Sequence, residues 1–156
     1  MNRQGQRGGA RDLVNIADVG FGLSQALPVV VALLAARPGQ IVYVEQPEIH
    51  LHPRAQVQLA EVLASAARRG VRVIVETHSA LILRSVQTLV AKGRIDSESV
   101  LLHWFSRRAS DGASEVASTR LDSEGAFGDW PEDFDEVLLN AEKAYLDAVE
   151  QKKLFG

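Results

Sequence analysis

The sequence predicts a domain of the α/β class, and three observations lead to that prediction. Two short runs rich in β-branched residues, 41–44 and 71–75, are separated by a stretch with helical periodicity. The chain has 156 residues, which is the usual size of one domain. Hydrophobic residues make up 46% of it, so the chain can build a core and is not a disordered protein. We therefore expect two parallel strands that are joined by a helix.

The first third of the chain predicts a tail, a helix and a strand. Residues 1–11 are rich in glycine and arginine without periodicity, which is typical of a flexible tail. The nearly continuous apolar stretch 23–36, which an Arg-Pro-Gly sequence ends, predicts a buried helix. Residues 41–44 show no alternation, so this run predicts a central strand that is covered on both faces.

The middle of the chain predicts the crossover helix, the second strand and another helix. Pro53 stands at a first helical position, apolar residues follow on one helical face, and Gly70 ends the helix. The run 71–75 is the second strand. Ser79 is a good N-cap for a further amphipathic helix that extends to Gly93.

The last third predicts a β-hairpin and a small helical appendage. Residues 100–105 and 115–121 flank a Ser-Asp-Gly turn, which is the pattern of an antiparallel hairpin. The appendage should be a helix whose apolar side is formed by Leu138, Ala141, Tyr145 and Ala148. The predicted organisation is a tail at 1–11, a main lobe at 12–121 and the appendage at 122–156.

Composition and charge exclude several classes of function. The formal net charge is −3, so a dedicated nucleic-acid-binding domain is not expected. The absence of cysteine excludes disulfides, thiolate zinc sites and cysteine nucleophiles. The longest apolar run, 26–36, is too short to cross a bilayer and no secretory signal is recognisable, so we expect a cytoplasmic protein without a membrane partner. Arg68, Arg69 and Arg72 form a basic group that we expect to complement a helix end.

Acidic residues and histidines follow the first predicted strand. Glu45, Glu48, His50 and His52 lie within eight residues of one another. The carboxyl ends of parallel strands are where ligands of α/β folds bind. Burying acids at such a place is costly unless a cation or a proton compensates their charge. The alternative is that the acids are solvated in a loop and that the histidines cap the next helix.

The second predicted strand ends in a comparable way, with the sequence Glu-Thr-His-Ser at 76–79. We expect the two strand ends to lie side by side, because parallel strands present their carboxyl ends at the same edge of a sheet. Glu45, Glu48 and His78 would then converge on one ligand. Alternatively, the threonine and the serine only cap the next helix, and the histidine has no role.

A glycine-rich segment, 18–25, opens the first predicted helix. Gly20 and Gly22 lie in it, and such a turn before a helix offers backbone amides and a positive helix end to phosphate. Glycine turns before helices are common, so this segment predicts a phosphate site only in combination with the two strand ends.

In this order and spacing, these segments resemble the second half of an ABC-type ATPase. They look more closely like the bacterial AAA ATPases related to the overcoming-lysogenization-defect (OLD) group, because Pro-Glu-Ile-His-Leu-His-Pro and Thr-His-Ser each follow a strand. The resemblance covers residues 14 to about 150. It implies a partial P-loop NTPase core with parallel central strands, flanking helices, a β-hairpin and a C-terminal helix. Residues 129–132 and the last helix are similar to a small C-terminal domain of unknown function.

The resemblance implies that this chain contributes to binding ATP and Mg²⁺. The glycine-rich segment stands at the signature motif, which contacts the γ-phosphate held by the opposite subunit, and one histidine stands in the D-loop. The residues implied to contact the nucleotide are Gly20, Gly22, Ser24, Gln25 and His52.

The resemblance also implies which residues serve catalysis. Glu45 stands at the magnesium-directing position of the Walker B strand, where it acts through water. Gln46 stands where the family usually has the general-base glutamate, Glu48 belongs to the Pro-Glu-Ile-His stretch, and His78 is the switch histidine.

Two departures from the family pattern matter. The chain contains no G-x-x-x-x-G-K-[ST] sequence, so it lacks the amides and the lysine that hold the β- and γ-phosphates, and alone it should not bind ATP tightly. A Walker A-bearing lobe is therefore the expected partner, either in the same longer protein or as a separate chain, unless the chain is a degenerate relative. Gln46 cannot accept a proton, so Glu48 or Glu45 would have to act as the base.

The same resemblance carries expectations about assembly. We expect a homo-oligomer, because sheets without their neighbouring strands expose an edge and an apolar face. Contact with DNA is expected only through a larger assembly.

Other functions stay open on the sequence alone. Ser24, Glu48 and His78 occur in the chain order of a serine hydrolase triad, in which Ser24 would be the nucleophile. His50, His52 and Glu48 are ligand types that suit zinc or manganese in a metal hydrolase. A non-catalytic regulatory or partner-binding lobe is the third alternative.

Overall fold

The computed structural model describes residues 21–128, 140 and 143–151. The chain divides into two compact units, Met1–Thr77 and His78–Gly156, and each is described by itself below. Several sequence predictions concern residues outside the described ones, namely the tail at 1–11, Gly20, residues 129–132, Leu138 and Ala141.

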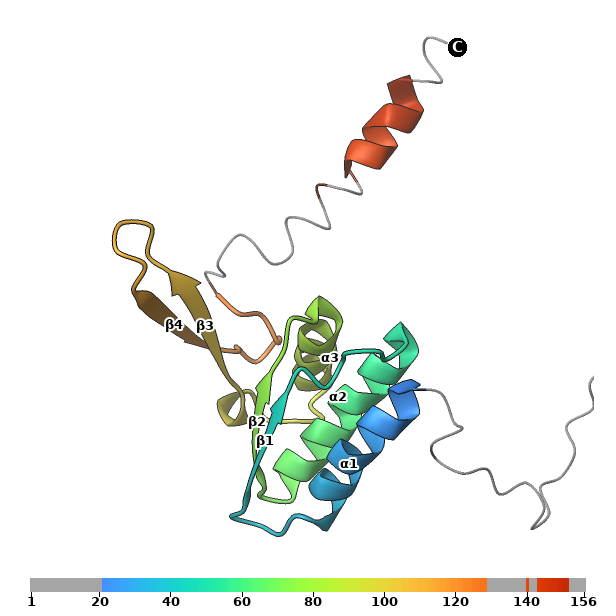
Figure 1. The fold of residues 1–156 in the computed structure, drawn as a ribbon, viewed down its shortest axis with the longest axis vertical. Helices are drawn as coiled ribbons and strands as arrows, with labels where there is room; N and C mark the ends of the chain where they lie inside the picture. The colour runs from blue at the N-terminus through green and yellow to red at the C-terminus, as the bar shows by residue number, and fades with distance from the viewer. Residues whose placement is uncertain (1–20, 129–139, 141–142, 152–156) are drawn as a thin grey trace, which may run out of the picture. The chain divides into compact units, whose positions relative to one another are not determined.

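The first unit contains the predicted strand-helix-strand arrangement. It consists of α1 (Phe21–Ala35), β1 (Ile41–Glu45), α2 (Pro53–Arg68) and β2 (Arg72–Glu76). The strands pair in parallel with Ile41 opposite Arg72 and Glu45 opposite Glu76, so the predicted parallel pair is confirmed. Figure 1 shows α1 and α2 side by side along the strands.

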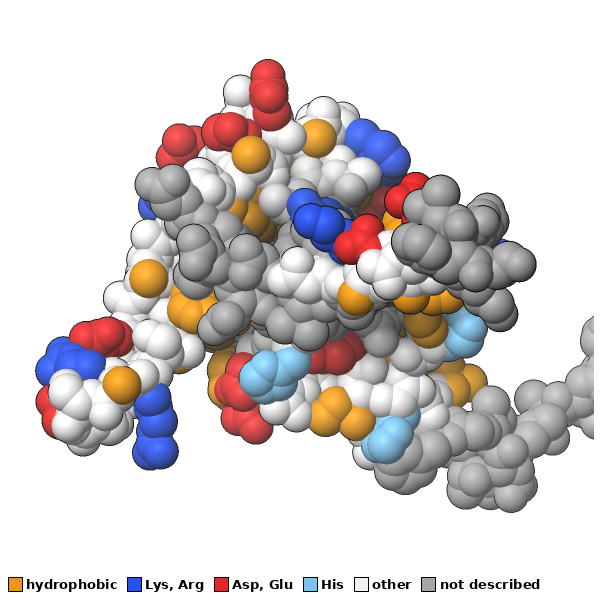
Figure 2. Space-filling view, turned by 90° about the horizontal axis from the view of Figure 1, so that it is seen from above, with side chains coloured by type: hydrophobic (Ala, Val, Ile, Leu, Met, Phe, Trp, Pro, Cys, Tyr) orange, Lys and Arg blue, Asp and Glu red, His pale blue; other side chains and the backbone are white. Residues whose placement is uncertain are grey.

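The prediction that the first strand is covered on both faces is wrong for the described part of the chain. Val42 and Val44 point toward the helices, whereas Ile41 and Tyr43 are 60% and 55% exposed. Ile74, which pairs with Tyr43, is 52% exposed. The two helices of this unit pack on one face of the sheet only, so alternate residues of each strand face outward. Hydrophobic side chains of both strands are therefore exposed to solvent. Figure 2 shows hydrophobic side chains, in orange, at the molecular surface.

The first helix also differs from its prediction as a buried helix. Leu33 is fully buried, but four large side chains are 40–62% exposed, namely Leu23, Leu27, Val31 and Leu34. Their spacing places them on one helical face. Within this unit α1 packs against α2 and β1, and these contacts occupy only the opposite side of the helix. The helix formed by this continuous apolar sequence thus has one buried face and one exposed face.

The ends of α2 agree with the sequence. His52 is the N-cap, Pro53 opens the helix, and Gly70 ends it with a φ of +85°. Two members of the basic group lie at helix ends, as we expected, because Arg68 is in the last turn of α2 and Arg69 contacts the last turn of α1. Arg72 lies in β2. The Arg69 guanidinium donates a hydrogen bond to the Leu33 carbonyl oxygen in the last turn of α1, where carbonyl groups lack helical partners.

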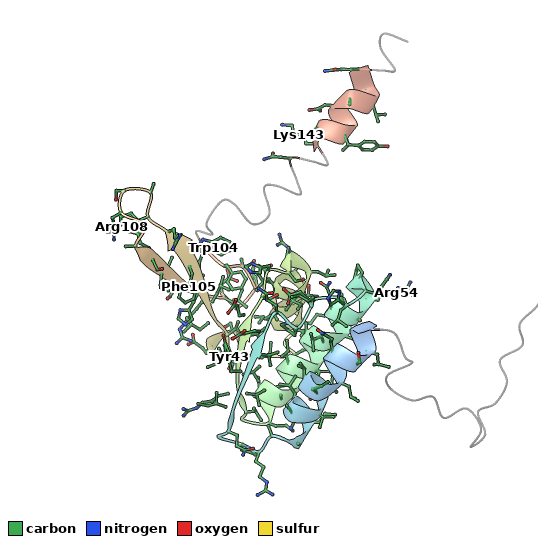
Figure 3. The ribbon with its side chains drawn as sticks, in the orientation of Figure 1. Tyr43, Arg54, Trp104, Phe105, Arg108 and Lys143 are labelled. Carbon is green, nitrogen blue, oxygen red and sulfur yellow. The ribbon has the colours of Figure 1, made fainter. Side chains whose placement is uncertain are left out.

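The second unit contains α3 (Ala80–Ala91), the short helix η2 (Ser97–Ser99), β3 (Leu101–Arg107) and β4 (Ser114–Arg120). Ser79 caps α3 as predicted, because its Oγ accepts a hydrogen bond from the Ile82 amide at 3.1 Å. The predicted hairpin is confirmed, since β3 and β4 pair antiparallel. Arg108 at its tip (Figure 3) bonds Glu115 at 2.6 Å.

The end of the second unit agrees with the predicted helical appendage as far as it is described. Residues 143–151 are helical, and Tyr145 lies in them with an exposed side chain. None of the helices in the described part of the chain has the length and the apolar character needed to span a membrane.

Candidate functional site

The carboxyl ends of β1 and β2 form the edge of the sheet at which the sequence predicted a ligand-binding site. Glu45 and Glu76 are paired residues of the parallel ladder, and both side chains are exposed. The expectation that the two strand ends lie side by side is therefore confirmed. Both acids lie on the outward face of the sheet together with Tyr43, because they alternate with the inward-facing valines.

Tyr43 connects the two strands at this edge. Its hydroxyl donates a hydrogen bond to Oε2 of Glu76, with 3.3 Å between the two oxygen atoms. The nearby Glu45 carboxylate is the largest cause that raises the pKa of Tyr43 to about 12, and the Glu76 carboxylate contributes in the same direction. A tyrosine with two carboxylates beside it resists ionisation, since a phenolate would be repelled by both.

The chain turns sharply after β1. Gln46 and His50 have φ values of 43° and 66°, a left-handed conformation that side-chain-bearing residues seldom adopt. The Gln46 amide donates to the Glu76 carbonyl oxygen at 2.7 Å, and the Leu51 amide donates to the Glu48 carbonyl oxygen at 2.9 Å. These bonds hold the backbone in a costly conformation, which is a feature that concentrates at functional sites.

The acids around this turn differ in their surroundings. Glu45 is exposed, whereas Glu48 is half-buried and its Oε2 atom is shielded from solvent. Pro47 between them is buried. The two carboxylates proposed from the sequence therefore differ in solvent exposure. Glu45 is exposed on the outward face, and Glu48 is partly shielded.

The first turn of α1 packs against the same loop. A Cβ atom on Gly22 would lie 2.6 Å from the His50 carbonyl oxygen, so only glycine permits this approach. The structure thus brings the glycine-rich segment and the loop after β1 together. Ser24 and Gln25 lie inside α1 (Phe21–Ala35), which agrees with the helix predicted over 23–36, and Gly22 lies in the first turn of the same helix.

The two other predicted contact residues have different positions. His52 caps α2, because its Nδ1 accepts a hydrogen bond from the Arg54 amide at 3.2 Å. This is the structural role that the sequence left open for a histidine. His78 is exposed and opens the second unit, so its convergence with Glu45 and Glu48 stays a prediction.

Two alternatives from the sequence gain no support. A hydrolase nucleophile of the elbow type sits on a tight turn between a strand and a helix, but Ser24 lies within α1. Among the residues that the structure describes, no three acids or histidines are grouped so as to hold a metal ion. His50, His52 and Glu48 therefore do not form the ligand set of a metal hydrolase.

Sequence reasoning pointed to the segment 76–79 but did not single out Tyr43 and Glu76, which lie beside Glu45 at this edge of the sheet. Two signals were present in the sequence. Glu76 closes the second strand as Glu45 closes the first, and Tyr43 stands two residues before Glu45, which places both on one face of a strand. The pairing of the two acids needed the register, which the sequence does not specify.

The described elements of the first unit fall within a match to a known protein family. A family model covers residues 6–84 and is described as "AAA domain, putative AbiEii toxin, Type IV TA system". The chain belongs to this family. Membership in the AAA-domain family indicates an ATP-binding domain of the P-loop ATPase type, and the mixed α/β architecture with a parallel strand pair is compatible with a partial P-loop NTPase. No curated protein matches the chain.

The family generally binds ATP with Mg²⁺, and the donor atoms at the sheet edge suit this ion. Mg²⁺ takes oxygen ligands and keeps several waters, so it uses one or two carboxylates together with phosphate oxygens. Glu45 and Glu76 are two exposed carboxylates at paired positions. The edge therefore fits the ion as a partner of a bound nucleotide, and not as an all-protein cage.

We predict that Gly22→Ala destabilises the protein. Alanine normally stabilises a helix relative to glycine by roughly 1 kcal/mol. Here the added methyl group would collide with the His50 carbonyl, and overpacking of this kind costs about 1–3 kcal/mol. The free energy of unfolding should therefore fall, as urea denaturation would measure. Gly128→Ala is the control, because a Cβ there meets nothing within 4 Å. Equal or higher stability of Gly22→Ala would contradict the close approach.

We predict that Tyr43 loses its proton only at high pH. The folded chain keeps this proton until about pH 12, and an unfolded chain loses it near the ordinary tyrosine pKa of 10.0. The stability supplied by the group is thus present below pH 10 and is lost as pH rises toward 12. Tyrosinate absorbance should show a high-pH step that Tyr43→Phe removes and Tyr145→Phe retains. A high-pH profile that Tyr43→Phe leaves unchanged would refute the assignment.

Proposed function

We propose that the chain is one lobe of an ABC-type, OLD-like ATPase whose phosphate-binding loop belongs to another lobe. In this proposal α1 supplies the signature segment, β1 is the Walker B strand, the loop after β1 is the D-loop, and His78 is the switch histidine. Membership in the AAA-domain family supports the broader statement that the chain is of the P-loop ATPase type. The OLD-like assignment and the division into lobes rest on the motif resemblance.

One observation carries the proposal. The acidic ends of the two parallel strands, the strained loop after β1 and the first turn of α1 belong to one compact unit. Gly22 of α1 packs against the carbonyl of His50 in that loop. The three segments that the resemblance assigns to nucleotide chemistry are thus assembled around the carboxyl edge of a parallel sheet, where α/β folds bind ligands.

The chemistry proposed for this edge is hydrolysis of the γ-phosphate of ATP. When bound, Mg²⁺ would neutralise charge that develops on the phosphate oxygens. Glu45 would direct the ion through water, since its carboxylate is exposed at the strand end. Gly22 and the start of α1 would offer backbone amides to the γ-phosphate of a nucleotide held by the opposite subunit, as a helix N-terminus does for anions.

The proton from the attacking water needs a carboxylate acceptor. Gln46 can orient a water molecule through its amide but cannot take the proton. We assign the general-base role to Glu48, which follows in the same turn. His78 would donate a hydrogen bond to the γ-phosphate in the completed site.

The proposed partner is the lobe that carries Walker A, in the same longer protein or on a separate chain. A homo-oligomer of completed units is part of the proposal, because the signature segment serves a nucleotide held by the opposite subunit. Contact with DNA would arise only through such an assembly.

A second candidate function is a non-catalytic lobe that binds and regulates a partner. The open face of the sheet supports it, because Ile41, Tyr43 and Ile74 are more than half exposed. Parallel sheets in soluble proteins are normally covered on both faces. Glutamine at position 46, where a general base is usual, also suits a lobe with little or no turnover of its own.

We predict that the isolated chain binds Mg-ATP no more tightly than the millimolar range. The amides and the lysine of a Walker A loop are absent from the sequence, and they supply most contacts to the β- and γ-phosphates. Isothermal titration calorimetry measures the affinity directly. Micromolar binding by this chain alone would overturn the proposed division into lobes.

We predict ATP turnover when a Walker A-bearing lobe completes the site. Glu45→Gln and His78→Ala should each lower kcat by roughly a hundredfold, because each removes a group that stabilises transition-state charge. Glu48→Gln should bind nucleotide but stall before hydrolysis. The matched control is Glu124→Gln, which changes an exposed loop acid of the second unit. A complex of this chain with a Walker A-bearing lobe that forms but never hydrolyses ATP would favour the regulatory function. Normal ATP turnover by Glu48→Gln would rule out Glu48 as the general base.

A further inference from the structure

The outer edge of β1 is a backbone surface that the proposed function leaves without a role. Among the described strands, β1 pairs with β2 alone. The backbone groups of Gln40 and Gln46, which flank β1, bond β2. Successive residues of a strand direct their N–H and C=O groups to opposite sides, so the even-numbered residues between them also face β2. The backbone groups of Ile41, Tyr43 and Glu45 therefore point to the outer edge, away from β2.

A hollow lies between α1 and β1 at this edge, and its volume is about 350 Å³. Its walls are the end of α1 and the start of β1, namely Ala32, Ala35, Ala36, Gln40, Ile41 and Val42. None of these six residues belongs to α2 or β2, so the hollow opens on the side of the outer edge. The three alanines leave room there for the side chains of a further strand.

The helix layer of the first unit is wider than the two strands that it covers. Packed helices lie about 8–10 Å apart, whereas paired strands are only about 4.8 Å apart. α1 contacts β1 and α2 contacts β2, so two helices lie over two strands. α1 must therefore extend beyond the outer edge of β1. One further strand fits beneath this overhang, but a second copy of the unit does not, because its own helix would occupy the same place.

The segment directly before α1, residues 12–19, has the composition of a strand. This segment lies outside the described residues. Val14, Ile16 and Val19 are β-branched, and the segment contains no glycine, proline or basic residue. Eight extended residues span about 26 Å, which is more than the length of the five-residue strand β1. The segment is therefore long enough to run along the whole of β1.

The connectivity of the chain places this segment beside β1. α1 begins where Gly22 packs against the His50 carbonyl, in the loop at the carboxyl end of β1. A strand that enters α1 at this end runs parallel to β1. Strand-helix-strand crossovers are right-handed, and α1 covers the same face of the sheet as α2. Both crossovers are right-handed only if the strand before α1 lies on the outer edge of β1, opposite β2.

We propose that residues 12–19 add to the outer edge of β1 as a third, parallel strand beneath α1. The backbone of this strand bonds Ile41, Tyr43 and Glu45, and apolar side chains on one of its faces fill the hollow. The glycine-rich segment that follows is thereby delivered to the carboxyl edge of the sheet. The inference goes beyond the proposed function and does not rest on it, because a catalytic lobe and a regulatory lobe would need the same strand.

Amide hydrogen exchange of the full chain, followed by NMR, tests the pairing. The amides of Ile41 and Tyr43 should be protected although they face away from β2. Val14→Pro or Asn15→Pro should accelerate their exchange by about tenfold or more, because one of two neighbouring residues directs its N–H toward β1 and proline has none. The amides of β1 that face β2 should not change. Gln6→Pro, in the glycine-rich tail, is the matched control.

Disulfide trapping tests the same pairing through side chains. The chain contains no cysteine, so introduced pairs report without interference. Tyr43→Cys is combined with a substitution to cysteine at each of positions 13–16 in turn. Neighbouring strands lie about 4.8 Å apart, which is within the range that a disulfide bridges. Only alternate positions should form an intramolecular disulfide, because alternate residues of a strand face opposite sides.

Ile74→Cys is the matched control for Tyr43→Cys. Ile74 is paired with Tyr43 and is exposed on the same face of the sheet, but it lies on β2. Two strand spacings, about 10 Å, would separate it from the segment, which is too far for a disulfide. It should therefore form no disulfide with any of the four positions.

The other outcomes overturn the inference. Equal trapping at all four positions would mean that the segment reaches the edge without pairing as a strand. Disulfide-linked dimers would assign the edge to a second copy of the chain. Fast exchange of the Ile41 and Tyr43 amides in the full chain, with no trapping, would leave the edge open to a strand from a partner lobe.

Discussion

The candidate site depends on the parallel pairing of β1 with β2. The register places Glu45 opposite Glu76, so the two acids that end the strands become neighbours at one edge. The pairing continues for one residue beyond β1, because the Gln46 amide bonds the Glu76 carbonyl. A slip of the register by one residue would turn the outward-facing side chains of one strand toward the helices. The position of every group at this edge therefore follows from the ladder.

Close backbone packing links this edge to the helix layer. Gly22 lets α1 approach the loop after β1, and the loop itself contains two residues in a left-handed conformation. Gln46 and His50 bear side chains, so this conformation is costly and must be held by the surrounding bonds. The hydrogen bonds of the turn and the cap of α2 supply that support. The loop after β1 thus contains both the strained residues and the close contact with Gly22. The motif resemblance assigns nucleotide chemistry to this same loop.

The uncovered surfaces of the first unit have a common cause. Its sheet contains two strands and its helices pack on one face, so alternate residues of each strand and one face of α1 remain exposed. Ile41, Tyr43 and Ile74 are among these exposed side chains, and apolar side chains of this kind are normally covered in α/β proteins. The chemistry at the sheet edge and the apolar surface beside it both agree with a lobe that functions in association with further polypeptide.

The sequence by itself determined the order and type of the elements. β-Branched runs, the helix-opening Pro53, the cap Ser79 and the helix-ending glycines are local signals, so strands, helices and the hairpin were predictable from them. Only the tertiary structure decided which faces are covered, because an apolar run reads the same whether one or both of its faces are packed. It also decided the contacts of Tyr43 with Glu76 and of Gly22 with His50. Each joins residues far apart in the chain, and such contacts follow from register and packing, which no local pattern encodes.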